Sequence, residues 1–395
     1  MSDTRKTTKP NVPNLRFPGF EGEWARCTLG EIGEPYIGLT YSPADVVSEG
    51  GTIVFRSSNI QNGEIDYSDI VRVNKIIKDS IITRKDDLLI CARNGSPRLI
   101  GKNALLKEAD EGQTFGAFML VFRSNDNHFV HQLLCTKGYN SQVSENLGAR
   151  INQITTSNIR DFEFCFPQST AERNKIAGFL DLIDERIAVQ SRLIEDLKKL
   201  RCAIVEKMFK QSKANGRLGD FIEQVSVRNK NGLYSNVLSV SNKQGFVKQS
   251  EQFEDRTVAS EDTSNYKIVK RNNFAYNPAR INVGSIARLT KFDVGIVSPM
   301  YVCFRTKASI IPEYMEAFFT SQQFFYEMMK RLEGSVRLCL SYEGLCNIPV
   351  YIPDMNKQIA MGQNISLILS KIGLEIEYLG RLHQQKQYLL RKMFI

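Results

Sequence analysis

Two loops of similar composition carry the side chains that are best suited to chemistry. One spans residues 92–98 and the other residues 278–285, and both combine arginine, asparagine, serine and glycine. Guanidinium groups bond guanine edges and phosphates, amides bond adenine edges, and glycine lets a backbone approach closely. The chemistry that these residues suit is hydrogen bonding to a nucleic acid. Such loops are often simple solvated turns, and it is their occurrence at matching places in the chain that favours binding.

Other short polar segments have the same character, and each is a weaker candidate when it is taken alone. They lie at residues 56–59, 150–153 and 228–230 and at residue 337. The residues that we expect to contact DNA are Arg56, Ser57, Asn59, Arg93, Asn94, Ser96, Arg98, Lys102, Arg150, Asn152, Gln153, Arg228, Asn229, Lys230, Arg280, Asn282, Ser285 and Arg337.

Motifs for catalysis are incomplete. Asn277 begins only the first half of the Asn-Pro-Pro-aromatic segment that an adenine methyltransferase needs to grip a flipped base. The Pro-Asp pair at Pro353 is not followed by the acidic-x-Lys triplet of a metal-dependent nuclease, and a GxxxxGK[ST] phosphate loop is absent. For His128 and His131, a surface or helix-packing role is favoured over a zinc site. We therefore expect a non-catalytic chain that itself binds no cofactor and no metal.

The composition is that of a globular protein with a basic balance. Of the 395 residues 42% are hydrophobic, which is enough for two or three domains with proper cores. The net charge of +9 is compatible with a polyanionic partner but does not by itself establish one. Eight widely separated cysteines indicate reduced thiols, and no run of about eighteen apolar residues occurs. We expect a cytoplasmic protein without a membrane segment.

A long amphipathic helix is predicted from Ala171 to Phe209. Apolar residues recur there in alternating steps of three and four, which is a heptad pattern. At about 1.5 Å per residue the helix would be roughly 55–60 Å long, far longer than is usual in a globular domain. A second apolar flank suits either a partner protein or packing on the chain's own domains. It consists of Phe179, Leu182, Val189, Leu193 and Leu200.

The pattern of the first half returns after about 185 residues. Cys27–Ile32 is answered by Gly216–Ile222, and both halves close on Lys-Met-Phe. Short apolar runs between turn residues predict strands and loops, and residues 129–146 predict a helix. We expect an α+β fold in which two similar mixed α/β domains are separated by two long helices. The expected parts are a flexible tail at 1–14, a first domain at 15–167, a helix at 168–212, a second domain at 213–354 and a second helix at 355–395.

The connectivity predicts how the two helices pair. The first leaves domain one and enters domain two, whereas the second leaves domain two, so they must run antiparallel if they form a coiled coil. The two halves would then be related by a pseudo-two-fold axis. B-DNA has two-fold axes perpendicular to its length, and paired readers commonly sit about one helical turn, roughly 34 Å, apart. Because the loops of the two domains differ, the predicted target is bipartite and asymmetric, with an unread gap that the coil sets.

The arrangement resembles the specificity subunit of type I restriction–modification enzymes. The likeness covers nearly the whole chain from Leu15 on. It is carried by the opening LRFPGFEGEW, by the LGEI that follows at residues 29–32, and by two halves that each end in a proline followed by a long helix bearing Ile-Ala. The resemblance implies two target recognition domains, each of which reads one half of a split double-stranded DNA site, and an antiparallel helical spacer.

The resemblance also implies the partners. Two modification (methyltransferase) subunits would dock on the helices and methylate adenine with S-adenosylmethionine. Restriction (endonuclease and translocase) subunits, which use ATP and Mg²⁺, would join the same assembly. Two other interpretations stay open: a two-headed coiled-coil adaptor that binds proteins and, less favoured, an autonomous methyltransferase or nuclease.

Overall fold

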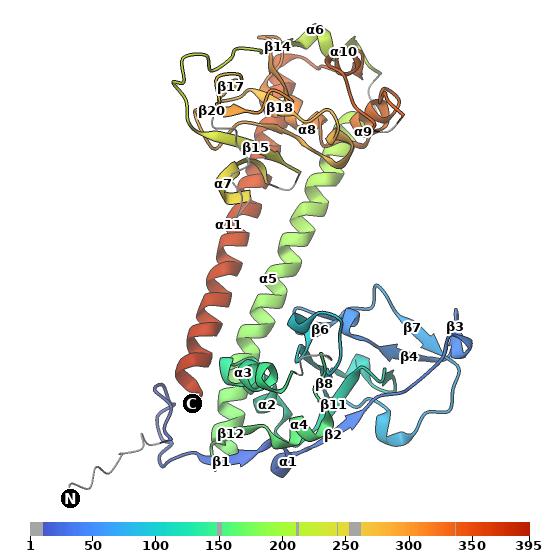
Figure 1. Ribbon diagram of the computed structural model, residues 1–395, viewed down its shortest axis with the longest axis vertical. Helices are drawn as coiled ribbons and strands as arrows, with labels where there is room; N and C mark the ends of the chain where they lie inside the picture. The colour runs from blue at the N-terminus through green and yellow to red at the C-terminus, as the bar shows by residue number, and fades with distance from the viewer. Residues whose placement is uncertain (1–10, 148–151, 211–212, 243, 253–261, 336) are drawn as a thin grey trace, which may run out of the picture. The chain divides into compact units, whose positions relative to one another are not determined.

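The computed structural model describes residues 11–147, 152–210, 213–242, 244–252, 262–335 and 337–395. The chain divides into two compact units (Figure 1). Unit one contains the residues up to Gln190 together with Tyr378–Ile395, and unit two contains Ser191–Glu377. Each of the two long helices therefore contributes one part to each unit.

In its described residues, unit one combines short strands with four short α-helices and parts of the two long ones. Its strands are β1 (Ala25–Thr28), β2 (Glu34–Ile37), β3 (Val46–Val47), β4 (Thr52–Phe55), β5 (Ile60–Gln61), β6 (Glu64–Ile65), β7 (Val71–Val73), β8 (Leu88–Cys91), β9 (Asn103–Leu105), β10 (Thr114–Phe115), β11 (Met119–Arg123) and β12 (Glu163–Phe166). Its helices are α1 (Leu29–Ile32), α2 (Asn127–Leu133), α3 (Lys137–Asn146), α4 (Thr156–Asp161), the beginning of α5 (Thr170–Lys210) and the end of α11 (Met355–Met393).

An antiparallel sheet in the order β2-β11-β8-β9 forms the centre of unit one. Strand β8 is buried on both faces, because Leu88 and Ile90 belong to one hydrophobic cluster while Leu89 and Cys91 belong to another. Because both faces of this strand are buried, its sequence is a continuous apolar run and does not alternate between apolar and polar residues. A second sheet, β10-β4-β7-β3, packs on the second cluster, and β1 pairs with β12.

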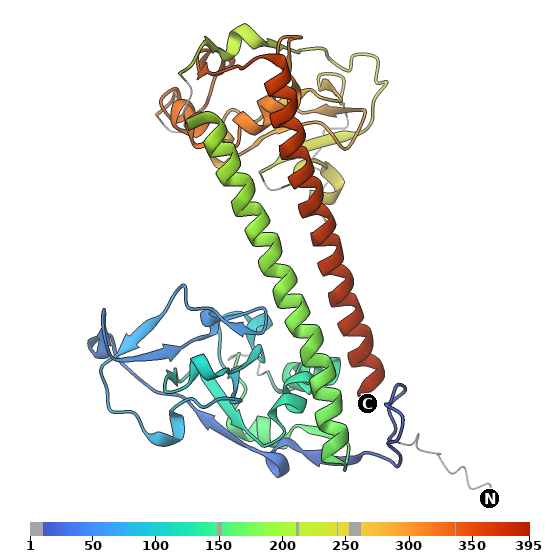
Figure 2. The ribbon, with the colours of Figure 1, turned by 180° about the vertical axis from the view of Figure 1, so that it is seen from behind.

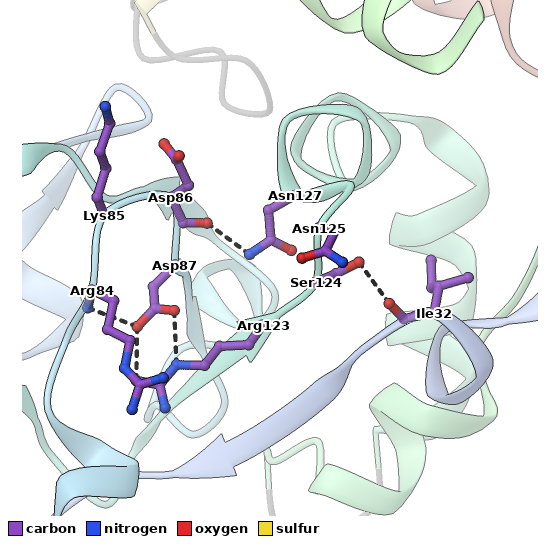
Figure 3. Close-up of a pocket in the computed structure, with 9 residues that line it drawn as sticks. All are labelled: Ile32, Arg84, Lys85, Asp86, Asp87, Arg123, Ser124, Asn125 and Asn127. Atoms are coloured by element: carbon purple, nitrogen blue, oxygen red, sulfur yellow. Dashed lines mark hydrogen bonds and ion pairs between the residues drawn. The ribbon is translucent and has the colours of Figure 1, made fainter. Parts of the chain in front are cut away.

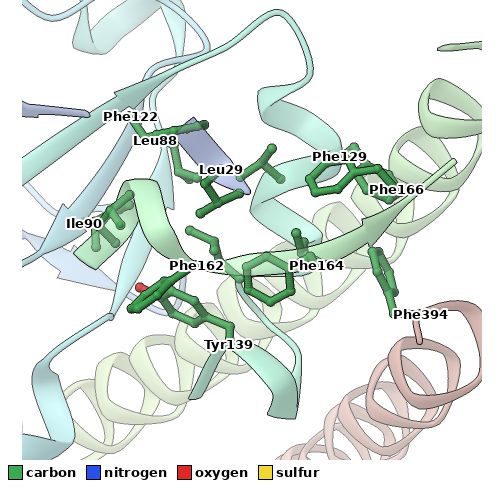
Figure 4. Close-up of a cluster of buried hydrophobic side chains, with 14 of the residues drawn as sticks. Leu29, Leu88, Ile90, Phe122, Phe129, Tyr139, Phe162, Phe164, Phe166 and Phe394 are labelled. Atoms are coloured by element: carbon green, nitrogen blue, oxygen red, sulfur yellow. The ribbon is translucent and has the colours of Figure 1, made fainter. Parts of the chain in front are cut away.

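The larger core of unit one joins the sheet to the helices (Figure 4). The Phe129 ring of α2 lies 5.4 Å from the Phe166 ring of β12 and 5.2 Å from the Phe394 ring after α11, measured between centroids. Trp24 is only 2% exposed and also packs on Phe394. Burial of each such side chain stabilises the fold by about 1.5–3 kcal/mol. The last turn of α11 is therefore part of the core of unit one.

The described residues of unit two form the same kinds of element in fewer strands. Its strands are β13 (Gly216–Arg217), β14 (Ile222–Gln224), β15 (Val237–Ser241), β16 (Gly245–Lys248), β17 (Lys267–Lys270), β18 (Phe274–Tyr276), β19 (Ile286–Arg288), β20 (Val294–Val297), β21 (Val302–Thr306) and β22 (Pro349–Val350). Its short helices are α6 (Leu218–Phe221), α7 (Gln249–Gln252), α8 (Pro312–Phe318), α9 (Gln322–Met329) and α10 (Tyr342–Cys346).

The two units share one architecture, which confirms the predicted fold class. The sheet β14-β21-β18-β19 repeats the order of β2-β11-β8-β9, and β13-β22 repeats β1-β12. Even a turn is repeated: Asp86 and Asn272 have positive φ angles of 63° and 68°, and each N–H donates to a leucine carbonyl at 2.9 Å. Aspartate and asparagine tolerate this left-handed conformation better than most residues. The internal repeat of the sequence is therefore a structural repeat.

The helix predicted over residues 129–146 is in fact two helices, α2 and α3. The break lies at Thr136, which is the N-cap of α3 and whose hydroxyl accepts a hydrogen bond from Tyr139 N at 3.4 Å. Threonine competes with the helix ladder by bonding the backbone in this way and therefore favours a helix start over a helix interior. Tyr139 can then turn into the core of unit one, where it is 1% exposed.

The two long helices run antiparallel inside unit one, as the connectivity predicted. Asp184 of α5 bonds Lys386 of α11 at 2.6 and 2.7 Å, and the Arg186 guanidinium lies 5.6 Å from the Tyr378 ring centroid. Later positions of α5 thus meet earlier positions of α11, a pairing that Figure 2 shows from behind. Leu180 of the predicted heptad seam is fully buried here.

In unit two, α11 packs closely on α8. A Cβ atom at Gly362 would lie 2.9 Å from the Glu313 Cβ, which is closer than side chains tolerate. This contact accounts for a glycine inside a helix of 39 residues, where it costs about 1 kcal/mol relative to alanine. Neither long helix is apolar enough to cross a membrane, and the same holds for every other helix in the described part of the chain.

Candidate nucleic-acid interface

Amide hydrogen bonds hold the loop after β8 in one conformation. Asn94 Nδ2 donates to the Ser57 hydroxyl at 2.9 Å, and Asn94 Oδ1 accepts from Ser96 N at 3.0 Å. Asn152 Nδ2 donates to a carbonyl of the same loop at 3.2 Å. The structure therefore brings together four of the predicted contact residues, which come from three separate segments of the sequence.

Cationic side chains project from this loop. Arg93 and Arg98 are exposed, and Lys102 is half-buried. Among the residues that the structure describes, none of the three forms a hydrogen bond or an ion pair through its charged group. The backbone of Arg93 is paired with that of Gln153 in an antiparallel bridge. Charges that are unpaired and held on an ordered loop are available to a polyanion.

The loop after β18 is built in the same way in unit two. Asn277 Oδ1 accepts from the backbone N–H two residues further on at 3.1 Å, and the buried Ser285 hydroxyl donates to a carbonyl of β15 at 3.1 Å. Gly284 has a φ of 89°, a left-handed conformation that glycine adopts without steric cost. Arg280 is exposed at this turn and Asn282 is half-buried. Ser285 therefore supports the loop, while Arg280 and Asn282 remain available for contacts.

Two predicted contact asparagines serve the fold, as Ser285 does. Asn59 is 1% exposed, and its Nδ2 donates to the carbonyls of Asp66 and Asp69 at 3.0 and 2.8 Å. Asn229 is equally buried and bonds both the carbonyl and the N–H of Tyr234. Buried amides whose groups are bonded to backbone are not free to read a base. We therefore correct the expectation for Asn59 and Asn229: both hold loops in place.

The remaining cationic candidates lie at other places. Arg56 is half-buried and bonds a carboxylate oxygen, whereas the exposed Arg228 bonds an asparagine side chain, both at 2.8 Å. Lys230 and Arg337 are exposed. Arg150 lies outside the described residues. The two loops after β8 and β18 thus remain the best-defined parts of the interface.

A polar pocket of about 400 Å³ lies at the start of β8 (Figure 3). Asp87, which is 3% exposed, bonds the Arg123 guanidinium at 2.8 and 2.9 Å and so ties β8 to β11. Asn127 Nδ2 donates to the backbone carbonyl of Asp86 at 2.7 Å. The sequence analysis did not single out this cluster, although an acidic residue before one buried strand and an arginine at the end of another are a visible signal. Its bonds indicate a structural role.

Titratable groups also meet where α2 contacts α5. Gln132 Nε2 donates to Asp181 and Asp184, at 2.8 Å each, and His128 Nδ1 lies 2.6 Å from the Asp181 carboxylate. That hydrogen bond raises the pKa of His128, whereas burial lowers the pKa of His131 to about 4. Within the described ranges no group of His, Cys, Asp and Glu side chains is arranged to hold a metal ion. The two histidines contribute to helix packing here.

Comparison with known families identifies the domain that carries the first loop. The family model of the type I restriction modification DNA specificity domain matches residues 21–199. Residues 21–199 are thus similar to a type I DNA specificity domain. The match begins before β1 and ends inside α5, so the matched segment includes the loop after β8 together with most of the first long helix.

Two curated relatives support this assignment. The StySPI specificity subunit of a type I restriction enzyme from Salmonella potsdam is 28% identical over 194 residues, which are 46% of this chain and 42% of the relative. The EcoKI specificity subunit from Escherichia coli (strain K12) is 27% identical over 194 residues, 46% of this chain and 41% of the relative. The chain is thus related to type I specificity subunits, and each match spans less than half of the relative's length.

Solved structures extend the likeness of fold beyond the specificity domain. An S subunit of a type I restriction–modification system from M. genitalium has a TM-score of 0.61 at 19% identity, over 97% of this chain and 99% of that chain. A second structure, reported as a structural basis for complex assembly of the type I R-M system, has a TM-score of 0.53 at 14% identity. The match covers 96% of this chain and 98% of that chain. The fold of both units and both long helices therefore has a counterpart in solved structures.

The long helix that the specificity domain enters carries the predicted docking flank. Leu182, Val189, Leu193 and Leu200 are 64%, 56%, 40% and 50% exposed. Phe179 differs, because it is half-buried with its ring centroid 5.7 Å from that of Phe17. The chain's own N-terminal segment therefore covers this one position, and four apolar side chains of the flank face solvent.

Proposed function

We propose that the chain is the sequence-specific DNA-recognition subunit of a type I restriction–modification complex. Each unit reads one half of a bipartite, asymmetric double-stranded site, and the long helices set the unread gap between the halves. One observation carries the proposal. The chain matches a specificity domain and presents two equivalent ordered loops, one in each unit, and each loop has an exposed arginine. Arginine is suited to this task, because its planar fork bonds guanine edges and phosphates.

Differences between the two loops support an asymmetric site. Unit one presents the exposed Arg93 and Arg98, whereas unit two presents Arg280 and Asn282. Side chains that differ in type and position offer different donors and acceptors to base edges. The two half-sites would therefore differ in sequence although the two units share one fold.

In this proposal, partner subunits carry out the chemistry. Two modification subunits dock on the exposed flank of Leu182, Val189, Leu193 and Leu200 and methylate adenine with S-adenosylmethionine. Restriction subunits that use ATP and Mg²⁺ join the same assembly in the cytoplasm. Four exposed aliphatic side chains on one helix support docking, since contiguous apolar surface marks sites of protein interaction. The chain itself contributes recognition and no bond-making step.

Mapping of methylated adenines tests the proposal. DNA from cells with and without the gene for this chain is sequenced for modified bases, and synthesis of the modification subunits is verified in both. We expect one split motif to lose its methylation when the gene is deleted. If all methylated motifs persist while the partner subunits are still made, the proposed function fails.

Salt-dependent binding separates this function from a protein-binding adaptor. Affinity for duplex DNA is measured with the full chain and its partner subunits over a range of salt concentrations. A DNA-recognition subunit releases counterions from phosphates, so the logarithm of the binding constant should fall steeply and linearly with the logarithm of salt concentration. Binding to proteins alone, without binding to the duplex at low salt, would favour the adaptor.

A further inference from the structure

An arginine–aromatic stack stands on the surface of unit one, at the start of β11. The Arg93 guanidinium lies 4.9 Å from the centroid of the Phe118 ring, and the ring is 57% exposed. The backbone fixes the same pair, because the N–H groups of Ala92 and Arg93 donate to the Phe118 carbonyl at 2.9 and 3.0 Å. Side chain and backbone therefore hold Arg93 against one aromatic face.

Stacking leaves the useful edge of the guanidinium free. A guanidinium that lies flat over a ring uses its face for that contact and keeps its N–H donors directed outward in the plane. Arg93 has no carboxylate partner in the part of the chain that the structure describes. A phosphate contact needs only a positive charge, which a mobile lysine supplies as well. A guanidinium whose plane is held in advance suits the two parallel acceptors, O6 and N7, of a guanine edge in the major groove.

The neighbours of the stack are also polar groups held in place. Gln153 is bridged to Arg93 through the backbone, and Asn94 is anchored on Ser57 at 2.9 Å. Phe118 is thus a large exposed aromatic side chain inside a polar surface, where it has little to gain from solvent. At the surface the ring can hold the Arg93 guanidinium, which it could not do from a position in the core.

Unit two lacks this stack at the equivalent place. Phe118 lies four residues before Phe122, which pairs with the first residue of β8, and Met300 lies four residues before Phe304, which pairs with the first residue of β18. Arg93 follows Ala92, whose carbonyl accepts a backbone hydrogen bond at 2.9 Å from the segment before α4. Ala279 follows Pro278, whose carbonyl accepts the equivalent bond at 3.1 Å from the segment before α10. Ala279 and Met300 therefore stand where unit one has Arg93 and Phe118. Met300 is 56% exposed but has no guanidinium beside it at position 279.

We propose that Arg93 and Phe118 form a guanine-reading unit, an inference that rests on the proposed function. Arg93 donates two hydrogen bonds to O6 and N7 of one guanine in the half-site that unit one reads. Phe118 is a positioning residue, which holds the guanidinium in the plane of the base. The half-site of unit two is read without such a unit at the corresponding position.

Variants in cells provide the first test, with the methylated motif as the readout. Arg93→Lys keeps the charge but loses the planar fork, and Phe118→Ala removes the stacking face. Both should relax one guanine position of one half-site, with a loss of preference of about tenfold, and leave the other half-site unchanged. Phe118→Tyr keeps the ring and should keep the preference. Ile76→Ala is the matched control, because Ile76 is 97% exposed on the loop after β7 and is not one of the predicted contact residues.

Modified bases provide the second test, which uses the unaltered chain and therefore does not depend on how any variant folds. Each guanine of the mapped half-site is replaced in turn by 7-deazaguanine, which lacks N7, or by hypoxanthine, which keeps O6 and N7 but lacks the minor-groove amine. At one position 7-deazaguanine should weaken binding of the full chain with its partner subunits about tenfold, and hypoxanthine should not. The Arg93→Lys chain should be insensitive to both.

The outcomes separate this inference from the proposed function. If a split motif depends on the chain but every guanine of both half-sites tolerates 7-deazaguanine, the guanine-reading unit is refuted and the recognition function stands. If Arg93→Lys weakens DNA binding equally on all sequences and reduces the dependence of affinity on salt, Arg93 contacts a phosphate. That result would equally overturn the inference. If no methylated motif depends on the chain, the proposed function itself fails.

Discussion

At the scale of single residues, burial decides what an arginine does in this chain. The Arg123 side chain is 15% exposed and is bonded to Asp87, which ties two central strands together. Arg93 and Arg98 are exposed on an ordered loop and, among the described residues, have no ion pair. A buried charge needs a partner because burial removes its hydration, whereas an exposed charge stays hydrated and can bind a ligand. The same residue type therefore serves the fold in one place and, as we propose, DNA in the other.

Removal of Arg123 should destabilise unit one strongly. Arg123→Ala leaves the Asp87 carboxylate buried without its partner, and we expect the free energy of unfolding to fall by about 3–5 kcal/mol. Arg160→Ala is the matched control, because Arg160 and Glu34 form an exposed pair with 47% and 49% of their side chains accessible, worth about 0–1 kcal/mol. Denaturant unfolding of the full chain measures both. Equal losses in the two variants would contradict the argument.

At the scale of elements, α2 meets α5 and α11 through polar groups and not only through apolar ones. Asp184 bonds Lys386 across the two long helices, and Gln132 of α2 bonds Asp184 as well. His131 of α2 faces Asp181, Asp184, Lys386 and its own neighbour His128. Buried polar contacts of this kind specify one register of a helix pair, because any other register leaves charges without partners.

The two histidines of α2 should affect stability at low pH in opposite directions. The pKa of His131 is lowered from 6.5 to about 4 by burial, so the unfolded chain binds a proton in this range while the folded chain does not, and stability falls as pH drops from 6.5 toward 4. His131→Gln should weaken this fall. The pKa of His128 is raised above 6.5 by Asp181, so its contribution is complete below pH 6.5 and is lost as pH rises through the raised value.

Thermal melts of the full chain between pH 4 and pH 8, for the wild type, His131→Gln and His128→Gln, measure these effects. We expect the melting temperature of His131→Gln to depend less on pH below 6.5 than that of the wild type. The His128→Gln variant should lose most stability on the acidic side. Parallel curves for all three proteins would show that neither histidine is linked to folding in this way.

Lengthening of the helices tests their role as a spacer. One heptad added to α5 and one added to α11 at paired positions adds about 10 Å, because each residue rises about 1.5 Å. If the helices set the unread gap, the methylated motif should gain about three base pairs between unchanged half-sites, since each base pair adds about 3.4 Å. Sequencing of methylated adenines reads both quantities. An unchanged gap in a variant that still directs methylation would remove the spacer role.

At the scale of the whole molecule, one architecture is used twice with different loops. The equivalent sheet orders and the turn shared by Asp86 and Asn272 show that the frame is conserved between the units. The side chains at the loop after β8 and the loop after β18 are not conserved in number or position. A common frame with separate loops allows each unit to read its own sequence, so the two recognition events should be independent.

Independence can be tested with one variant in each unit. Arg98→Ala should weaken or relax only the half-site of unit one, and Arg280→Ala only that of unit two, because each exposed arginine belongs to a different loop. A lost base contact costs about 1–3 kcal/mol, which is a large change in preference at one position. The methylated motifs of the two variants show which half-site changes. The same loss from either variant would contradict independent reading.

Periodicity and repetition in the sequence by themselves determined the elements and their duplication. The run Thr52–Phe55 is the strand β4, the heptads of residues 171–209 lie inside α5, and the repeat of about 185 residues corresponds to two units with equivalent sheets. These features follow from local patterns, because the spacing of apolar residues reports directly whether a segment is a helix or a strand. The connectivity also required the two long helices to be antiparallel if they pair with each other.

Only the tertiary structure decided what individual polar residues do. The sequence predicted that Asn59 contacts DNA, but its side chain donates hydrogen bonds to backbone carbonyls. Arg93 packs on an aromatic side chain, Phe118, that lies far from it in the chain. Which side chains meet depends on strand register and on the paths of loops, and a shift of one residue turns a side chain to the opposite face. Residue type is a local property, but the partner that gives a residue its role is supplied by the fold.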